Sequence, residues 1–313
     1  MLKKIKNIFS KNADETIGNG LFVTVEELVE QRKFLKYIKL NKKKSTLSAN
    51  AGDIKSAFKG RGIELAESRK YIFGDDVRGI DWRLTARKQD PYTKIFHEER
   101  DREIFVLLDL SNTMVFGSKK ELKSVAAAKI AGLIGWMSLE NSDRFGCVLF
   151  DGKQIHMYKP QNNRNSLMAV YKKISDVSRK ILKQNVSHVE LETAVRRLKK
   201  HVKSQPMVFV ISDFYEFDEG LKKSLVALSK VSKLYCLDII DFLEENAPKS
   251  GEYMIAHHNE KLVFESSGKV FGKEYQKYFE KKRFEIEDFC KKFGMRYIAI
   301  RTYENLHSQL ILG

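Results

Sequence analysis

Residues 103–114 read Glu-Ile-Phe-Val-Leu-Leu-Asp-Leu-Ser-Asn-Thr-Met and decide the fold. Their continuous apolar run, 104–108, predicts a parallel strand that is covered on both faces of its sheet. The run leads directly into Asp109, Ser111 and Thr113. Ligands of such sheets bind outside the carboxyl ends of the strands. The sequence therefore predicts a functional site where this strand ends.

The residue types at this strand end predict a site for a divalent cation. Asp109, Ser111 and Thr113 supply a carboxylate and two hydroxyl groups, which are hard ligands suited to Mg²⁺ or Mn²⁺. A second apolar strand, 207–211, ends on Ser212 and Asp213. We expect Asp213 at the same sheet edge, as a further metal-site residue. The alternative is that each aspartate only caps the helix that follows it.

From residue 102 onward, apolar strands alternate with helical patterns. Strands are predicted over 104–108, 145–150, 207–211, 234–240 and 297–300, and helices over 119–139, 163–182, 189–202, 218–230 and 271–293, with a short helix from 304. Segment 154–158 is predicted as the hairpin partner of 145–150, and segment 253–265 as another strand or a hairpin. Strands joined by helical crossovers indicate an α/β fold with a doubly wound sheet and helices on both faces.

The chain before residue 102 has a different pattern. Thr24 and Glu27 match a capping box, which predicts a helix over 25–40. Short strand and turn signals follow it. The predicted domains are an N-terminal tail and helix (1–48), a small β-rich subdomain (49–101) and the α/β domain with a C-terminal extension (102–313).

The net charge is +16, from 57 Lys and Arg against 41 Asp and Glu. The excess is concentrated in residues 1–100, with 22 basic and 14 acidic side chains, and in residues 151–200, with 12 and 4. Basic segments favour acidic partners, including nucleic acid. A solvated lysine-rich surface is the simpler interpretation, because no basic run is long.

The three cysteines, Cys147, Cys236 and Cys290, lie in apolar contexts without a CxxC spacing, which indicates reduced thiols in a cytoplasmic protein. The N-terminus has no long apolar region and does not resemble a signal peptide. The most apolar predicted helix, 125–139, is too short to cross a bilayer. We therefore expect a cytoplasmic protein without a membrane span.

A charged stretch, residues 69–87, reads Arg-Lys-Tyr-Ile-Phe-Gly-Asp-Asp-Val-Arg-Gly-Ile-Asp-Trp-Arg-Leu-Thr-Ala-Arg. It resembles the signature of domain of unknown function 58, a family of von Willebrand factor A-like proteins often encoded beside MoxR-type AAA+ ATPases. Residues 109–113 resemble the Asp-x-Ser-x-Ser metal-ion-dependent adhesion site of A domains, with Thr113 in place of the last serine. Residues 211–213 resemble the later Asp-bearing strand end. The resemblance covers about residues 50–245.

The resemblance implies a metal-dependent binding module rather than an enzyme. It implies that Asp109 and the two hydroxyl groups hold Mg²⁺, that Asp213 supports them, and that an acidic residue of a partner completes the coordination. The chain departs from the pattern in the segment Ser187-His-Val-Glu-Leu191. Val189 stands where a ligand threonine is expected, and valine cannot coordinate a metal. Ser187 or Glu190 could substitute for it.

The 69–87 stretch mixes cationic, carboxylate and aromatic side chains, which usually form Arg–carboxylate networks. Such pairs suit the packing of two domains on each other. The alternative is that they present a rigid face to a partner. The residues expected in either role are Arg69, Tyr71, Gly74, Asp75, Arg78, Asp81, Trp82 and Arg87.

The resemblance to this family implies a non-enzymatic adaptor for a MoxR-type AAA+ ATPase or its client. One alternative is a nucleic-acid-binding protein that uses the basic segments. Another is a haloacid-dehalogenase-like phosphatase, because residues 109–113 differ at one position from the Asp-x-Asp-x-Thr loop of those enzymes. Ser111 cannot relay a proton as the second aspartate does. The sequence also lacks a GxxxxGK[ST] motif for binding ATP.

Overall fold

The computed structural model describes residues 20–37, 63–98, 102–183, 190–203, 205–247, 252–257, 260–265 and 269–310. The chain forms two compact units. Residues 1–41 and 102–313 form the first, here named the α/β unit, and residues 42–101 form the second, the inserted unit. The sequence predicted a separate segment over 1–48, whereas its described part belongs to the α/β unit.

The α/β unit is built on a six-stranded sheet of order β10-β7-β6-β3-β4-β5. All neighbouring strands are parallel except β4 and β5, which form an antiparallel pair. This arrangement confirms the predicted doubly wound fold and the hairpin partner expected at 154–158. The strands are β3 (Glu103–Asp109), β4 (Arg144–Phe150), β5 (Ile155–Gln161), β6 (Met207–Ser212), β7 (Lys233–Ile240) and β10 (Arg296–Arg301).

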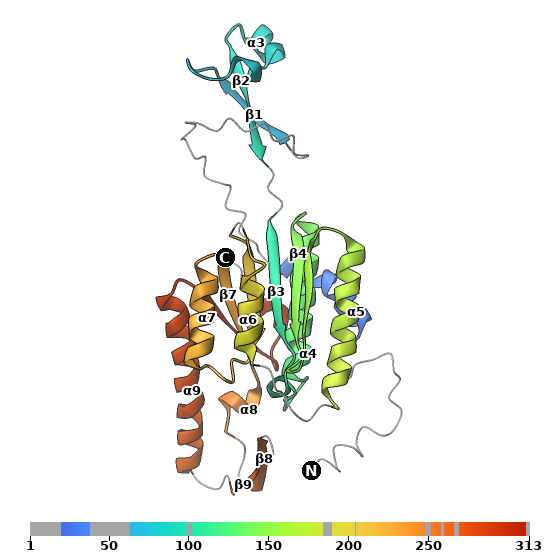
Figure 1. Ribbon diagram of the computed structural model, residues 1–313, viewed down its shortest axis with the longest axis vertical. Coiled ribbons are helices and arrows are strands. Elements are labelled where there is room, and N and C mark those ends of the chain that lie inside the picture. Colours follow the sequence, from blue (N-terminus) through green and yellow to red (C-terminus); the bar gives the residue numbers. More distant parts are fainter. Residues whose placement is uncertain are drawn as a thin grey trace. The chain divides into compact units, whose positions relative to one another are not determined.

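Helices cover both faces of this sheet (Figure 1). In β3, Ile104, Val106 and Leu108 pack in one core with α4 and α5. Phe105 and Leu107 point to the other face and pack with α6, α7 and α9. Residues 104–108 of the strand are therefore all apolar because both of its faces are buried. These helices are α4 (Lys123–Glu140), α5 (Arg164–Ile181), α6 (Leu191–Lys199), α7 (Glu219–Ser229) and α9 (Lys269–Lys292).

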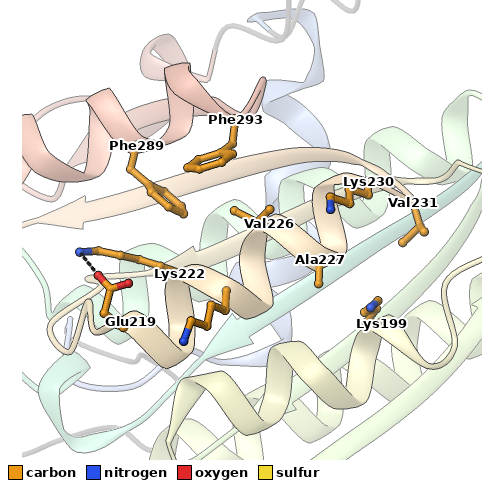
Figure 2. Close-up of a pocket in the computed structure, with 10 residues that line it drawn as sticks. Lys199, Glu219, Lys222, Val226, Ala227, Lys230, Val231, Phe289 and Phe293 are labelled. Atoms are coloured by element: carbon orange, nitrogen blue, oxygen red, sulfur yellow. Dashed lines mark hydrogen bonds and ion pairs between the residues drawn. The ribbon is translucent and has the colours of Figure 1, made fainter.

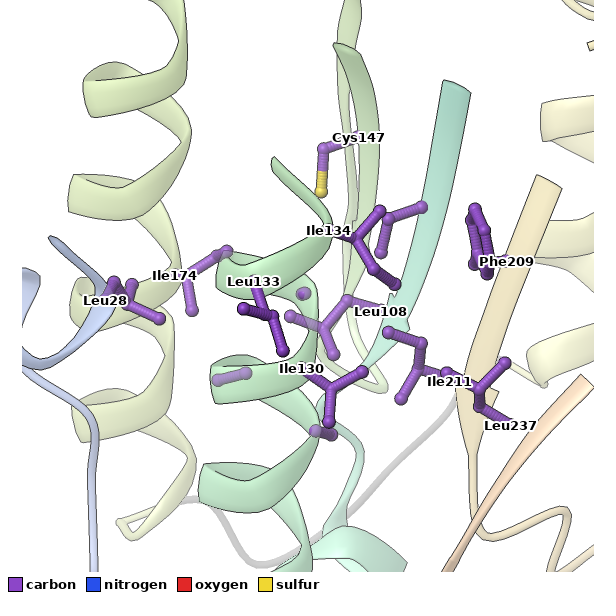
Figure 3. Close-up of a cluster of buried hydrophobic side chains, with 14 of the residues drawn as sticks. Leu28, Leu108, Ile130, Leu133, Ile134, Cys147, Ile174, Phe209, Ile211 and Leu237 are labelled. Atoms are coloured by element: carbon purple, nitrogen blue, oxygen red, sulfur yellow. The ribbon is translucent and has the colours of Figure 1, made fainter. Parts of the chain in front are cut away.

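Helix α4 is the centre of the first core. Every residue from Lys123 to Ser138 except Lys129 is buried. Figure 3 shows Ile130 and Ile134 of α4 directed toward Leu108. The helix is buried all round because α2 (Val25–Glu30) and η1 (Gln31–Tyr37) pack on it from a distant part of the chain.

The N-terminal helix is shorter than predicted. The capping box is present, since Thr24 N donates to Glu27 Oε2 at 2.9 Å and Glu27 N donates to Thr24 Oγ1 at 3.2 Å. The α-helix then ends at Glu30 and continues as a 3₁₀ helix to Tyr37. At the change, the Leu28 carbonyl accepts the indole Nε1 of Trp136 at 3.0 Å. Packing against α4 therefore overrides the helical pattern of the sequence.

The inserted unit is a two-stranded antiparallel sheet with helical turns between its strands. Its elements are β1 (Ile63–Lys70), η2 (Val77–Gly79), α3 (Trp82–Lys88) and β2 (Tyr92–Glu98). β8 (Glu252–His257) and β9 (Glu260–Glu265) form a second hairpin, which is one of the two alternatives predicted for 253–265. The short elements η3 (Asn112–Met114), α8 (Phe242–Glu245) and α10 (Leu306–Gln309) complete the described structure.

No helix within the described ranges is both long and apolar enough to cross a membrane.

The first testable prediction concerns the core beneath α4. Leu108→Ala should lower the free energy of unfolding by about 3–4 kcal/mol, because Leu108 is fully buried and its truncation leaves a cavity. Urea unfolding followed by circular dichroism measures the change. The matched control is Leu182→Ala, since Leu182 is 38% exposed. Equal effects of the two variants would contradict this account of the core.

Candidate functional site

The parallel pairing of β3 and β6 brings the two predicted aspartates to one edge of the sheet. Leu108 lies opposite Ile211 in the register of these strands. Asp109 is the last residue of β3, and Asp213 follows the last residue of β6. Their exposed fractions are only 3% and 4%. The carboxylates therefore lie beneath the surface at the carboxyl end of the sheet.

Hydrogen bonds join all four predicted metal-site residues. Ser111 N donates to Asp109 Oδ1 at 2.8 Å, and the hydroxyl oxygens of Ser111 and Thr113 are 3.2 Å apart. Thr113 Oγ1 donates to Asp213 Oδ1 at 3.2 Å. Ser212 Oγ, which the sequence analysis did not include among the metal-site residues, donates to Asp109 Oδ2 at 2.6 Å. The structure thus places these side chains together. Whether they bind a metal stays a prediction.

A buried lysine completes the group. Lys123 is the first residue of α4, and only 3% of its side chain is exposed. Its Nζ donates to Asp213 Oδ2 at 2.6 Å and to Glu244 Oε1, from α8, at 2.8 Å. The name "edge cluster" is used below for Asp109, Ser111, Thr113, Lys123, Ser212, Asp213 and Glu244.

The ion pair between Lys123 and Asp213 stays charged because the charge of each group shifts the pKa of the other. Burial by itself lowers the pKa of Lys123, but the carboxylates of Asp213 and Glu244 outweigh burial and raise it above its ordinary value. Burial raises the pKa of Asp213, but the ammonium of Lys123 outweighs this effect and lowers it. Both groups are therefore ionised at neutral pH.

Asp109 is in a different environment. Burial, with a smaller contribution from the negative charge of Asp213, raises the pKa of Asp109 to about 6. Its hydrogen bonds to Ser212 and Ser111 limit the increase. The carboxylates of Asp213 and Glu244 are thus stabilised by the ammonium of Lys123, whereas that of Asp109 is held by hydrogen bonds.

The sequence analysis did not single out Lys123 or Glu244. It predicted that the helix begins at residue 119, but Ser118 donates both its backbone N and its hydroxyl to Asp241, so that α4 begins four residues later. One signal in the sequence could have drawn attention to Lys123. A lysine in the first turn of a helix opposes the helix dipole and therefore needs a carboxylate partner. Asp241 and Glu244 also form a capping box, which predicts α8.

There is little free space inside the edge cluster. The cavity beside it holds about 20 Å³, enough for about one water molecule. Its lining residues are Asp213, Asp238, Ile240, Glu244, Phe279, Lys282 and Arg283. Burial raises the pKa of Asp238 to about 7, although its carboxylate accepts the hydroxyl of Tyr297 at 2.8 Å. A substrate molecule would not fit in this cavity.

Aromatic and basic side chains surround the edge cluster. Phe116 is 41% exposed, Tyr215 46% and Tyr278 64%. Lys282 Nζ lies 5.0 Å from the ring centre of Tyr215, and Lys119 Nζ lies 4.4 Å from that of Phe242. The name "edge rim" is used below for Phe116, Lys119, Tyr215, Tyr278 and Lys282. Aromatic side chains next to cations are common at the centres of protein interfaces.

The donor set of the edge cluster has the oxygen atoms that Mg²⁺ requires, but its charge distribution does not favour the ion. A cation bound between Asp109 and Asp213 would lie close to the ammonium of Lys123. At about 4 Å and an effective dielectric constant of about 20, two unit charges repel by about 4 kcal/mol, and a divalent ion doubles that value. The described residues also contain no group of three or more His, Cys, Asp or Glu side chains arranged to hold a metal.

The segment where the sequence departs from the A-domain pattern is only partly described. Ser187 and Val189 lie outside the described residues. Glu190 is the exposed N-cap residue of α6, and its side chain makes no capping hydrogen bond. The suggestion that Ser187 or Glu190 substitutes for the expected threonine therefore stays a prediction.

The predicted Arg–carboxylate pairing occurs once among the described contacts of the inserted unit. Arg69 Nη2 lies 2.7 Å from Asp75 Oδ1, and Asp75 Oδ2 accepts the backbone N of Ile72 at 3.0 Å. Gly74 between them has a φ of +106°, which favours glycine. Tyr71 N donates to the Pro91 carbonyl at 2.8 Å. These contacts fix the turn after β1.

The other predicted signature residues are spread over the surface of the same unit. Asp81 caps α3 by accepting Leu84 N at 3.1 Å and also accepts the hydroxyl of Ser68 at 3.2 Å. Arg78, Trp82 and Arg87 are exposed, Trp82 to 69%. The interdomain and partner-binding roles of these residues both stay predictions.

A larger groove lies away from the edge cluster, between α7 and α9 with a contribution from α6 (Figure 2). Its volume is about 660 Å³. Its walls combine apolar groups with lysines, and the residues that line it are Lys199, Glu219, Lys222, Lys223, Val226, Ala227, Lys230, Val231, Phe289 and Phe293. The sequence analysis did not predict this groove.

The sheet order and the paired aspartates at its carboxyl edge define a von Willebrand factor A-like α/β protein. The chain belongs to the family described as "Protein of unknown function DUF58", whose model matches residues 67–285. It is also similar to the uncharacterized proteins Rv1480 of Mycobacterium tuberculosis and Mb1516 of Mycobacterium bovis. Each is 24% identical over 218 residues, which cover 69% of this chain and 67% of the relative.

The chain is also similar to several solved structures. An aerotolerance-related membrane protein from Bacteroides fragilis matches 66% of this chain and 94% of its own, with 14% identity and a TM-score of 0.43. BatB from Bacteroides thetaiotaomicron matches 62% and 98%, with 14% identity and a TM-score of 0.34. The SpRpn10 VWA domain matches 67% and 93%, with 11% identity and a TM-score of 0.35. At these scores the likenesses carry no argument about function.

Removing one partner of the buried ion pair should destabilise the fold. We expect Asp213→Ala to lower the free energy of unfolding by about 3 kcal/mol, because Lys123 keeps only Glu244 as a counter-ion. Urea unfolding at pH 7 measures the change. Glu285→Ala is the control, since it removes a solvent-exposed partner of Lys222 and should cost less than about 1 kcal/mol. Similar costs for both variants would contradict the importance of the buried pair.

The raised pKa of Asp109 predicts a dependence of stability on pH. The folded protein holds this proton up to about pH 6, whereas the unfolded chain releases it near the ordinary value of 3.8. Stability from this group is therefore present at low pH and is lost as the pH rises from about 4 to 6. The asparagine side chain of the Asp109→Asn variant has a similar shape and does not titrate.

We expect the stability of Asp109→Asn relative to wild type to increase by about 1–3 kcal/mol between pH 4 and pH 7.5. Urea unfolding in the presence of a chelator at several pH values measures this difference. A difference that does not change with pH would show that Asp109 titrates normally in the folded protein.

Proposed function

We propose that this chain is a non-enzymatic protein-interaction module that binds a partner at the edge rim. The observation that carries the proposal is the closed edge cluster beneath an exposed aromatic and basic surface. Its buried carboxylates are held by hydrogen bonds and by Lys123, and the adjoining cavity of about 20 Å³ has no room for a substrate. A surface that cannot admit a substrate can still dock a protein.

The charge of the edge rim indicates the chemistry of the partner. Lys282 lies beside the exposed ring of Tyr215, and Lys119 lies beside the half-buried ring of Phe242, so that an acidic side chain flanked by apolar groups would match this surface. The partner that the sequence resemblance suggests is a MoxR-type AAA+ ATPase or its client, for which the chain would act as an adaptor. The three buried free cysteines support a reducing, cytoplasmic location.

The two alternative functions, a phosphatase and a nucleic-acid-binding protein, require properties different from those of an interaction module. A phosphatase needs a free nucleophilic carboxylate, whereas both oxygens of Asp109 accept hydrogen bonds. Hydrolysis of a generic aryl phosphate by this chain would support the phosphatase function. Binding to nucleic acid through the basic segments would weaken steeply with salt. Absence of nucleic-acid binding at low salt would rule out this alternative function.

The edge-rim proposal predicts a local effect of mutation. Tyr215→Ser should weaken binding to the MoxR-type ATPase of the same organism by at least about tenfold, because aromatic anchors dominate interface energies. Phe293→Ser is the matched control, since Phe293 is similarly exposed and lies in the α7–α9 groove. Biolayer interferometry measures both affinities. Loss of binding only in the control would place the docking surface at the groove instead.

A further inference from the structure

The edge cluster contains a cation that belongs to the chain itself. Lys123 Nζ lies 2.6 Å from Asp213 Oδ2, the carboxylate expected to support a metal from the neighbouring strand. The same Nζ lies 2.8 Å from Glu244 Oε1. Its side chain is almost completely buried, so that this charge is not one of the many solvated lysines of the surface.

The position of this ammonium group is fixed from several sides. Glu244, one of its two partners, is itself held by its capping box, in which Asp241 N donates to Glu244 Oε2 at 2.9 Å. The ring centre of Phe116 lies 5.7 Å from Lys123 Nζ on another side. A swing of the lysine into solvent would leave the buried Asp213 without its counter-ion. Lys123 is therefore a built-in part of the site.

The location of Lys123 in the sequence also needs an explanation. As the first residue of α4, its charge opposes the positive end of the helix dipole. Burial adds a second cost. The attraction to Asp213 and Glu244 compensates both, which accounts for a lysine at the start of an otherwise apolar buried helix.

We propose that Lys123 supplies the positive charge at this edge and that the edge cluster excludes divalent cations. In a metal-dependent site, the ion neutralises the two aspartates at the strand ends. Here the ammonium of Lys123 neutralises Asp213, and hydrogen bonds from Ser111 and Ser212 hold Asp109. This proposal replaces the Mg²⁺ or Mn²⁺ ion expected from the sequence and does not depend on the identity of a partner.

Titration with Mn²⁺, followed by electron paramagnetic resonance of the free ion, tests the proposal on the full chain. Wild type should show no saturable site up to about 1 mM Mn²⁺. Lys123→Ala removes the ammonium and should bind Mn²⁺ at least about tenfold more tightly than wild type. Lys123→Met is a second variant, which keeps an apolar side chain of similar length in case the alanine variant does not fold.

Two controls make the outcome specific. Lys129→Ala removes another lysine of α4, paired with Glu121 and Glu27 outside the edge cluster, and should bind no Mn²⁺. Adding Asp109→Asn to the Lys123 variant should abolish the new site.

Saturable binding of Mn²⁺ by wild type that Asp109→Asn abolishes would overturn the proposal, whatever the Lys123 variants do. Failure of both folded Lys123 variants to bind Mn²⁺ would also overturn it, since the charge of Lys123 would then not be what excludes the ion.

Discussion

The parallel pairing of β3 with β6 is the constraint on which the rest of the α/β unit depends. Two strands that are about a hundred residues apart in the sequence end at the same edge, and a buried aspartate ends β3 and directly follows β6. The chain must then satisfy two carboxylates beneath its surface. The hydroxyl groups of the following loop, Ser212 and the ammonium of Lys123 meet that requirement together.

The position of the carboxylates also organises the elements around them. Lys123 joins the start of α4 to the end of β6 and to α8 after β7. Asp241, at the start of α8, accepts hydrogen bonds from Ser118 and Thr302, which lie in the loops after β3 and β10. Four strand ends are thus connected by buried polar contacts. The edge is consequently a platform joined by hydrogen bonds beneath the aromatic side chains that surround it.

Local patterns in the sequence were sufficient for most of the fold. The apolar runs of β3, β6 and β7 and the Thr24–Glu27 capping box all have short-range signals, and the predicted aspartates do lie together. The features that could not be predicted depend on contacts between residues that are far apart in the sequence. Lys123 finds its partners 90 and 121 residues away, and the end of α2 is set by Trp136, 108 residues from Leu28. The pairing of a lysine with a particular carboxylate leaves no trace in a single sequence.

The antiparallel pairing within the inserted unit has a topological consequence. Ile63, at the start of β1, lies opposite Glu98, at the end of β2, so that the chain enters and leaves this hairpin at one point. The insertion lies between η1 and β3 in the sequence. Because the entropy of closing a loop grows only slowly with the number of residues in it, an insertion of this length costs the α/β unit little. The inserted unit can therefore gain or lose residues at little entropic cost to the fold that carries it.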